Sequence, residues 1–125
     1  MPKLVLLAED EPNIIESLTF LLERAGFAVA AEQDGQAALE AALSGKPDLI
    51  ILDVMLSGID GFEILRRLRA DAACGTTPII MLTAKGQRED REAALREGAN
   101  LYITKPFSNA ELIEAVRGLL GGEER

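Results

Sequence analysis

The chain contains no histidine. This absence excludes Ser-His and Cys-His catalysis, histidine metal ligands, and any role for the chain as a histidine phosphodonor. If a phosphoryl group is transferred to this protein, the acceptor must be a carboxylate or a hydroxyl, and the donor must be another molecule.

Cysteine and long apolar runs are also scarce. Cys74 is the only cysteine, so no internal disulfide can form, which fits a reducing compartment. It stands between Ala73 and Gly75, which favours a small residue in a loop or at a helix end over a nucleophile. The first apolar run covers only residues 4–8, too short for a signal peptide or a membrane span. We therefore expect a cytoplasmic protein with no membrane contact.

Positive charge is in short supply as well. The sequence has 13 Lys and Arg against 21 Asp and Glu, which gives a net charge of -8. Such an acidic chain is not expected to bind nucleic acid directly through phosphates, and it better suits protein partners. Its 125 residues and 48% hydrophobic content are typical of one soluble domain. We expect this domain over residues 1–120, followed by a frayed polar tail over residues 121–125.

Five short apolar segments alternate with helical patterns along the chain. Two of the segments, residues 49–52 and 79–82, do not alternate with polar residues, which is typical of strands covered on both faces. The alternation predicts a doubly wound α/β fold with a parallel sheet and right-handed crossovers. The strands are expected at about residues 3–8, 28–31, 48–53, 78–83 and 101–104.

The expected helices have recognisable ends. The first has an apolar stripe from Ile14 to Ala25 and is ended by Gly26 in a C-cap position. The second covers about residues 36–43. The third opens at Asp60 and continues to Leu68, and the last opens at Ser108; Glu63 and Glu111 follow these two at capping-box spacing. The fourth, about residues 87–97, has little apolar surface, so it is expected to be weakly held, or simply a solvated edge helix.

Charged residues stand at the ends of three of the predicted strands: Glu9 and Asp10, then Asp53, then Lys105. Ligands of such folds bind at the carboxyl ends of strands, so these residues are expected to form a site. Carboxylates that converge to about 5 Å repel by roughly 3 kcal/mol per pair, and a cation must offset this repulsion. Mg²⁺ suits the site, with Mn²⁺ as the alternative, because it takes few carboxylates and accepts a phosphate oxygen.

Each of these residues also has a simpler interpretation. Glu9 and Asp10 could be charges at a helix N-terminus ahead of Pro12. Thr83 could be an ordinary strand-end residue, and Lys105 a surface charge before a sharp Lys-Pro turn whose isomer stays open. Asp53 is harder to explain in this way, because it follows four buried aliphatic residues. Since carboxylates form aspartyl-phosphate intermediates, Asp53 is the predicted nucleophile.

Four sequence blocks together resemble the receiver domain of two-component response regulators, and the resemblance covers essentially the whole chain. It implies a flavodoxin-like strand order 2-1-3-4-5 with helices on both faces of the sheet, as in a chemotaxis receiver. The blocks are Leu7-Ala8-Glu9-Asp10-Glu11-Pro12, Leu52-Asp53-Val54-Met55-Leu56, Met81-Leu82-Thr83-Ala84 and Tyr102-Ile103-Thr104-Lys105-Pro106-Phe107.

The resemblance implies a role for each site residue. Asp53 matches the phosphoacceptor, and it is also a Mg²⁺ ligand together with Glu9, Asp10 and the backbone carbonyl of Met55. The phosphate-binding positions are matched by Thr83, Ala84 and Lys105, and the switch pair by Thr83 and Tyr102, for which an edge aromatic with its hydroxyl in water is the alternative.

The resemblance also implies a function. The donor would be a histidine kinase or a phosphotransfer protein, and the domain would catalyse its own phosphorylation and slow dephosphorylation without being an enzyme in any other sense. Phosphorylation would change the surface formed by the fourth helix, the fifth strand and the last helix, which would signal to an unidentified downstream effector.

Two departures from the family pattern are visible. Ser57 stands where many receivers have proline, which is expected to loosen the loop after Asp53. Asn100 and Leu101 replace the paired aspartates of the winged-helix transcription-factor subfamily, which puts its salt-bridged dimer in doubt unless Arg117 finds another acid.

Three alternatives remain. An aspartyl phosphohydrolase usually has a second aspartate two residues after the nucleophile, where this chain has Met55. A flavin-binding domain would have its phosphate repelled by the acids of residues 9–11. A degenerate receiver would act as a binding module that needs no phosphorylation.

Overall fold

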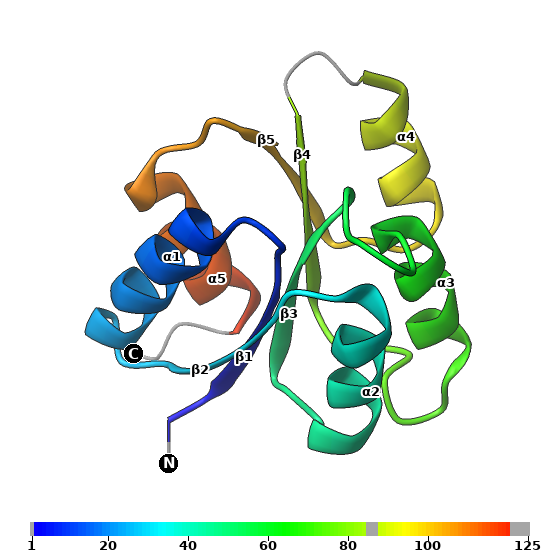
Figure 1. Cartoon of the computed structure of the whole chain (residues 1–125), viewed down its shortest axis with the longest axis horizontal. Coiled ribbons are helices and arrows are strands. Elements are labelled where there is room, and N and C mark those ends of the chain that lie inside the picture. Colours follow the sequence, from blue (N-terminus) through cyan, green and yellow to red (C-terminus); the bar gives the residue numbers. More distant parts are fainter. Residues whose placement is uncertain (1, 85–87, 121–125) are drawn as a thin grey trace.

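Five parallel strands form one sheet between two layers of helices in a computed structural model that describes residues 2–84 and 88–120 (Figure 1). The expected tail, residues 121–125, and the expected first residue of the fourth helix, Gln87, lie outside the described residues. In chain order the elements are β1 Leu4–Ala8, α1 Pro12–Arg24, β2 Ala28–Glu32, α2 Gly35–Gly45, β3 Leu49–Asp53, α3 Gly61–Ala70, β4 Ile79–Ala84, α4 Arg88–Arg96, β5 Leu101–Lys105 and α5 Asn109–Leu119.

The strand order is β2-β1-β3-β4-β5, which confirms the predicted flavodoxin-like topology. Each strand begins and ends within one residue of its expected bounds. All five residues of β3 are buried, since this strand lies at the centre of the sheet with helices on both faces. This explains why its sequence does not alternate between apolar and polar residues.

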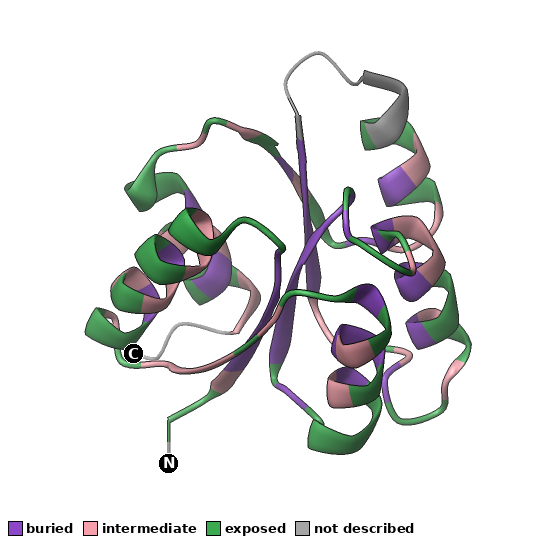
Figure 2. Ribbon diagram, in the orientation of Figure 1, coloured by how far each residue is buried: buried purple, intermediate pink, exposed green. Residues whose placement is uncertain are grey.

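Successive residues of each strand face opposite helix layers, which divides the core in two. In Figure 1, α1 and α5 cover one face of the sheet, and α2, α3 and α4 cover the other. Val5 and Leu7 of β1 pack on the α1–α5 side, while Leu6 and Ala8 pack on the α2–α3–α4 side. Figure 2 shows that buried residues run along the central strands and along the inner faces of the helices.

Most predicted helix ends are confirmed. Gly26, with φ +101°, lies one residue after the C-cap Ala25, and bonds from Gly26 N to Glu23 O and from Phe27 N to Leu22 O form a Schellman motif. Asp60 caps α3 by accepting from Glu63 N at 3.0 Å, and Ser108 caps α5 by accepting from Glu111 N at 3.0 Å.

The expected reciprocal half of the capping box, a bond from the N-cap backbone N–H to the glutamate three residues on, is absent among the described residues at both α3 and α5. At α3 the reason is visible. The Glu63 carboxylate accepts instead from Arg66 and Arg67, each at 2.9 Å. These guanidinium groups lie one turn along the same helix and attract the carboxylate more strongly than a neutral backbone N–H does.

Helix α4 has few apolar contacts along its described side chains, residues 91–96, where Ala94 is the buried residue and Leu95 is exposed. Its C-terminal end is nevertheless fixed, because Arg69 of α3 donates to Gly98 O at 2.9 Å and to Asn100 Oδ1 at 3.0 Å. Asn100 Oδ1 also accepts from Ile79 N at 2.9 Å. Asn100, one of the two residues that replace the paired aspartates of the winged-helix subfamily, therefore makes its side-chain hydrogen bonds within this domain.

Cys74 is buried beside α2, where its thiol lies 3.6 Å from Ala42 O. Burial, and next the nearby Asp71 carboxylate, raise the pKa of this thiol, which disfavours the reactive thiolate. This agrees with the expected structural role. No helix within residues 2–84 and 88–120 has the length and apolar character needed to cross a membrane.

Candidate functional site

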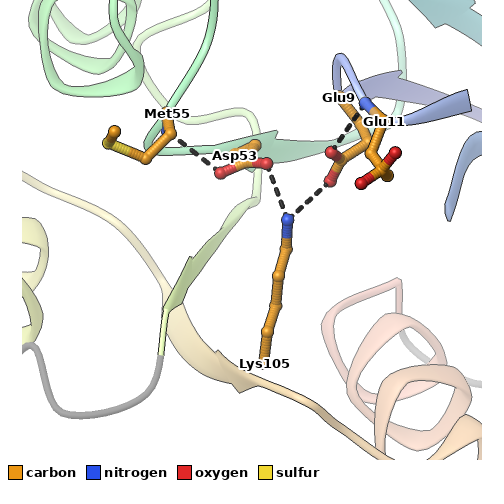
Figure 3. Close-up of polar contacts among 5 residues, drawn as sticks. All are labelled: Glu9, Glu11, Asp53, Met55 and Lys105. Carbon is orange, nitrogen blue, oxygen red and sulfur yellow. Dashed lines mark hydrogen bonds and ion pairs between the residues drawn. The ribbon is translucent and has the colours of Figure 1, made fainter.

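The site forms at the edge of the sheet where the parallel strands end. Glu9 follows β1, Asp53 is the last residue of β3, and Lys105 is the last residue of β5. Ala8 of β1 lies opposite Leu52 of β3, so the residues that follow them, Glu9 and Asp53, are neighbours. Figure 3 shows their carboxylates facing the ammonium group of Lys105, which reaches between them.

Lys105 connects the two buried acids. Its Nζ donates to Asp53 Oδ2 at 2.7 Å and to Glu9 Oε1 at 3.0 Å. Glu9 and Asp53 are buried, whereas Lys105 is partly exposed. The peptide bond between Lys105 and Pro106 is cis, one of the two forms that the sequence left open.

The remaining carboxylate oxygens are held by backbone N–H groups. Met55 N donates to Asp53 Oδ1 at 3.0 Å, and Glu11 N donates to Glu9 Oε2 at 3.1 Å. Neither donor could be predicted from the sequence, because a backbone N–H carries no signal of residue type. Both acids are thus fixed in orientation from two sides.

Glu9, Asp10 and Asp53 form a cluster that could hold a metal ion. One carboxylate oxygen from each lies within 4.8 Å of the others. Asp10 is exposed while the other two are buried, so the cluster is open to solvent on the Asp10 side. The structure therefore brings together the three side-chain ligands predicted from the sequence. Carboxylate oxygens are the donors that Mg²⁺ prefers.

Burial disfavours the ionised form of Glu9 in spite of its contact with Lys105. Burial, and next the charge of Asp53, raise the pKa of Glu9 from 4.5 to about 7, although Lys105 acts in the opposite direction. Burial lowers the pKa of Lys105, but its contacts with Asp53 and Glu9 outweigh burial, and the pKa lies above its usual value. Glu9, Asp10 and Asp53 together offer three carboxylates against the one ammonium group of Lys105, and a divalent cation would neutralise the difference.

Thr83 lies at the same edge of the sheet and is 2% exposed. It is opposite Thr104 of β5, and the next residue, Ala84, is opposite Lys105. In the part of the chain that the structure describes, the Thr83 hydroxyl has no hydrogen-bond partner. A buried hydroxyl without a partner is costly, and beside this cluster it is available for an oxygen-rich ligand.

Tyr102 lies farther from the strand ends, three residues before Lys105. It is half-buried and packs against the core on the α2–α3–α4 side, opposite Met81 of β4. The predicted switch residues Thr83 and Tyr102 are therefore on adjacent strands, β4 and β5.

Comparison with known proteins gives a consistent result. The family model described as the response regulator receiver domain matches residues 5–117. A transcriptional regulatory protein for alkaline phosphatase synthesis, PhoP of Bacillus subtilis, is 43% identical over 99% of this chain and 51% of its own length. The chain thus spans about half the length of the curated relatives it matches.

Solved structures agree with these sequence matches. A response regulator from Chloroflexus aurantiacus superimposes with a TM-score of 0.92, at 36% identity, over 97% of this chain and 99% of that one. The receiver domain of the sensor histidine kinase PA1611 from Pseudomonas aeruginosa, with a magnesium ion coordinated in its active-site cleft, gives a TM-score of 0.89 at 34% identity, over 98% of this chain and 100% of that one.

Proposed function

Since this chain belongs to the response regulator receiver domain family, we propose that it takes up a phosphoryl group on Asp53 from a histidine kinase or a phosphotransfer protein. The observation that carries the proposal is the position of the Asp53 carboxylate. It is buried at a strand end, with one oxygen on Lys105 Nζ and the other on Met55 N.

The transfer needs a nucleophile that is held in place and a site that tolerates added negative charge. An Asp53 oxygen forms the new P–O bond while the P–N bond to the donor's histidine breaks. The product carries a charge of about -1.5 to -2. Lys105 lies 2.7 Å from Asp53 and offsets part of this charge, while Thr83 and the backbone N–H of Ala84 offer donors to the phosphoryl oxygens.

A divalent cation fits the residues present. Glu9, Asp10 and Asp53 would hold it with their carboxylates, and Met55 with its backbone carbonyl; Mg²⁺ is the ion proposed, and Mn²⁺ the alternative. When bound, the ion neutralises charge on the transferring phosphoryl group. The charge count supports the assignment, because three carboxylates converge at a site where Lys105 is the cation that contacts Glu9 and Asp53.

The effect of phosphorylation then reaches a surface of the domain, where a partner can bind. Movement of the Thr83 hydroxyl towards the phosphoryl group would change the space beside Tyr102 on the adjacent strand, and so shift a two-state equilibrium. The readout surface is formed by α4, β5 and α5. The small number of apolar contacts along α4 fits an element that can shift.

The effector that receives this signal is not identified by the site. The relatives include transcriptional regulators about twice as long as this chain, which suggests an effector that controls transcription. This domain itself, with a net charge of -8, is not proposed to contact nucleic acid. It acts as a signalling domain whose chemistry is its own phosphorylation and slow dephosphorylation.

Intact-mass spectrometry tests the proposal. The protein is incubated with acetyl phosphate and Mg²⁺, with and without a chelator, beside Asp53→Asn as the matched isostere. We expect the gain of one phosphoryl group in the wild type, its loss with chelator, and no gain in Asp53→Asn. Phosphorylation of Asp53→Asn at the wild-type rate would show that the acceptor is another residue.

A folded wild type that gains nothing, either from acetyl phosphate or from a panel of phosphorylated histidine kinases, would favour the degenerate receiver. No observation favours that alternative here, because the acidic cluster, the lysine and the buried threonine are all present at one edge of the sheet.

A further inference from the structure

The N-terminus of α2 lies against the loop that connects β3 to α3, residues 54–60. Gly35 N donates to Ser57 O at 2.8 Å, and Asp34 and Ser57 form an isolated parallel β-bridge. Both helices pack on the same side of the sheet (Figure 1). Gly35 is some 20 residues before the acceptor in sequence and belongs to none of the blocks that carry the family resemblance, yet it contacts the loop that follows Asp53.

The close approach at this contact requires glycine. A Cβ added at Gly35 would lie 2.0 Å from Ile59 O and 2.8 Å from Ile59 N. Both atoms belong to the backbone, so no side-chain rotation can relieve the overlap, and the loop itself would have to move. Gly45, at the other end of the same helix, has no atom within 4 Å of the equivalent position.

The far side of the loop is tied to the acceptor. Met55 N donates to Asp53 Oδ1 at 3.0 Å (Figure 3), and Gly61 N closes the loop by donating to Val54 O at 3.0 Å. A Cβ at Gly61 would lie 2.5 Å from Asp53 O, so α3 also starts in direct contact with the end of β3. The loop therefore has little room between α2 and the Asp53 carboxylate.

Ser57 and Gly58 complete the contact. Ser57 stands where the sequence predicts a looser loop, yet its carbonyl is the group that accepts from Gly35. Gly58 has φ +82°, and a Cβ there would lie 2.9 Å from Asp34 Oδ1, the second oxygen of the carboxylate that caps α2. A side chain at Gly35 or at Gly58 would therefore push the loop away from α2.

We propose that Gly35 is a positioning residue for phosphorylation: by allowing the backbone of Ile59 to lie against α2, it holds the loop so that Met55 N orients the Asp53 carboxylate. The inference rests on the proposed function, since it assigns Gly35 a part in the same reaction. Gly35 acts through Ile59 and Met55, and touches neither the acceptor oxygens nor a phosphoryl group.

The experiment compares Gly35→Ala with Gly45→Ala, a matched glycine-to-alanine change in the same helix. Two quantities are measured: the backbone amide resonance of Met55 in ¹⁵N-labelled protein, and the rate of phosphoryl uptake from acetyl phosphate at saturating Mg²⁺. In Gly35→Ala we expect a shifted Met55 amide and uptake at least about tenfold slower, because small misplacements of a nucleophile have large effects on rate. Gly45→Ala should match the wild type in both.

A second pair of variants separates positioning from loss of stability. Val116→Ala removes buried volume on the opposite face of the sheet, so it lowers the melting temperature without touching the loop. Gly58→Ala disturbs the same contact from the side of the loop, where the overlap is with a side-chain oxygen, and it takes over the comparison if Gly35→Ala does not fold. Positioning predicts that Gly58→Ala shifts the Met55 amide and slows uptake, whereas Val116→Ala, measured below its melting temperature, does neither.

The inference is overturned if the loop variant leaves the Met55 amide and the uptake rate at their wild-type values, or if Val116→Ala slows uptake equally at a similar melting temperature. A wild type that takes up no phosphoryl group would overturn the proposed function instead. In that case the Met55 amide still decides whether Gly35 positions the loop.

Discussion

The ammonium group of Lys105 lies 2.7 Å from a carboxylate oxygen of Asp53, although β4 separates the strands that carry these two residues. The lysine side chain therefore reaches across the end of β4. The same Nζ also donates to Glu9 beyond β1, so one cation connects the ends of three strands. Removal of this cation would leave two buried carboxylates facing each other.

Lys105→Met should therefore destabilise the metal-free protein. We expect a loss of about 2 kcal/mol near pH 8, below the range for a fully buried ion pair because Lys105 is partly exposed. The loss should shrink towards pH 5, where Glu9 is protonated. Urea unfolding in the presence of a chelator measures the loss, with the exposed Lys3→Met as the control. Equal losses for the two variants would contradict the predicted role.

The raised pKa of Glu9 predicts a pH dependence of stability. The pKa is about 7 in the folded protein against 4.5 as the model value, so folding takes up a proton between these values. The contribution of Glu9 to stability is fully present below pH 4.5 and is lost as pH rises through 7. Metal-free wild type should thus lose stability relative to Glu9→Gln between pH 5 and pH 8, by at most about 3 kcal/mol.

Urea unfolding of both chelator-treated proteins at several pH values tests this dependence, because it measures their free energies of unfolding. Asp53, Asp10 and Lys105 surround Glu9 in both proteins, so the difference between wild type and variant isolates the glutamate. A difference that stays constant from pH 5 to pH 8 would mean that Glu9 is ionised throughout.

Mg²⁺ should raise the melting temperature by binding the folded state. At a concentration of one hundred times Kd the stabilisation is about 2.7 kcal/mol. Asp10→Ala removes the exposed member of the acidic cluster and should reduce this response, while Glu16→Ala, an exposed acid on α1, should not. Calorimetric scans with and without Mg²⁺ provide the comparison. An unchanged melting temperature in the wild type would argue against a cation site.

Thr83→Val should separate stability from switching. The buried hydroxyl has no hydrogen-bond partner among the described residues, so its replacement by a methyl group should be neutral or stabilise the unphosphorylated protein by about 1 kcal/mol. The variant should still gain a phosphoryl group on Asp53. It should lack the phosphorylation-dependent amide shifts of β5 and α5, with Thr83→Ser as the control that keeps the hydroxyl. Full shifts in Thr83→Val would show that the hydroxyl is not part of the switch.

The strands and the topology could be predicted from the sequence because short unbroken apolar runs that alternate with helical patterns are typical of a parallel sheet covered on both faces. The members of the site could be predicted for a related reason: parallel strands deliver the residues that follow them to one edge. The side-chain hydrogen bonds at the helix ends were harder to predict. Glu63 pairs with Arg66 and Arg67 in its own helix and does not accept from the N-cap backbone. Which partner a glutamate takes depends on side-chain conformations, which its spacing from the N-cap residue does not determine.

The difference between Glu9 and Asp10 is another feature that the sequence did not reveal. The two acids are adjacent and chemically alike, yet one is buried with Lys105 and the other is exposed. Which of them points inwards depends on how the chain leaves β1. The part of Gly35 was hidden for a different reason, because a contact between two backbones leaves no pattern of residue types.

The burial of Cys74 also provides a probe of local opening between α2 and the segment that follows α3. The single thiol is closed off beneath α2, so a thiol reagent can reach it only after that region separates from the loop that follows α3. The rate of labelling under native conditions therefore measures the free energy of local opening. Cys74 lies between the end of α3 and the start of β4, at the opposite edge of the parallel sheet from Asp53. Labelling with and without phosphodonor would therefore show whether chemistry at one edge of the sheet loosens or tightens the helix layer.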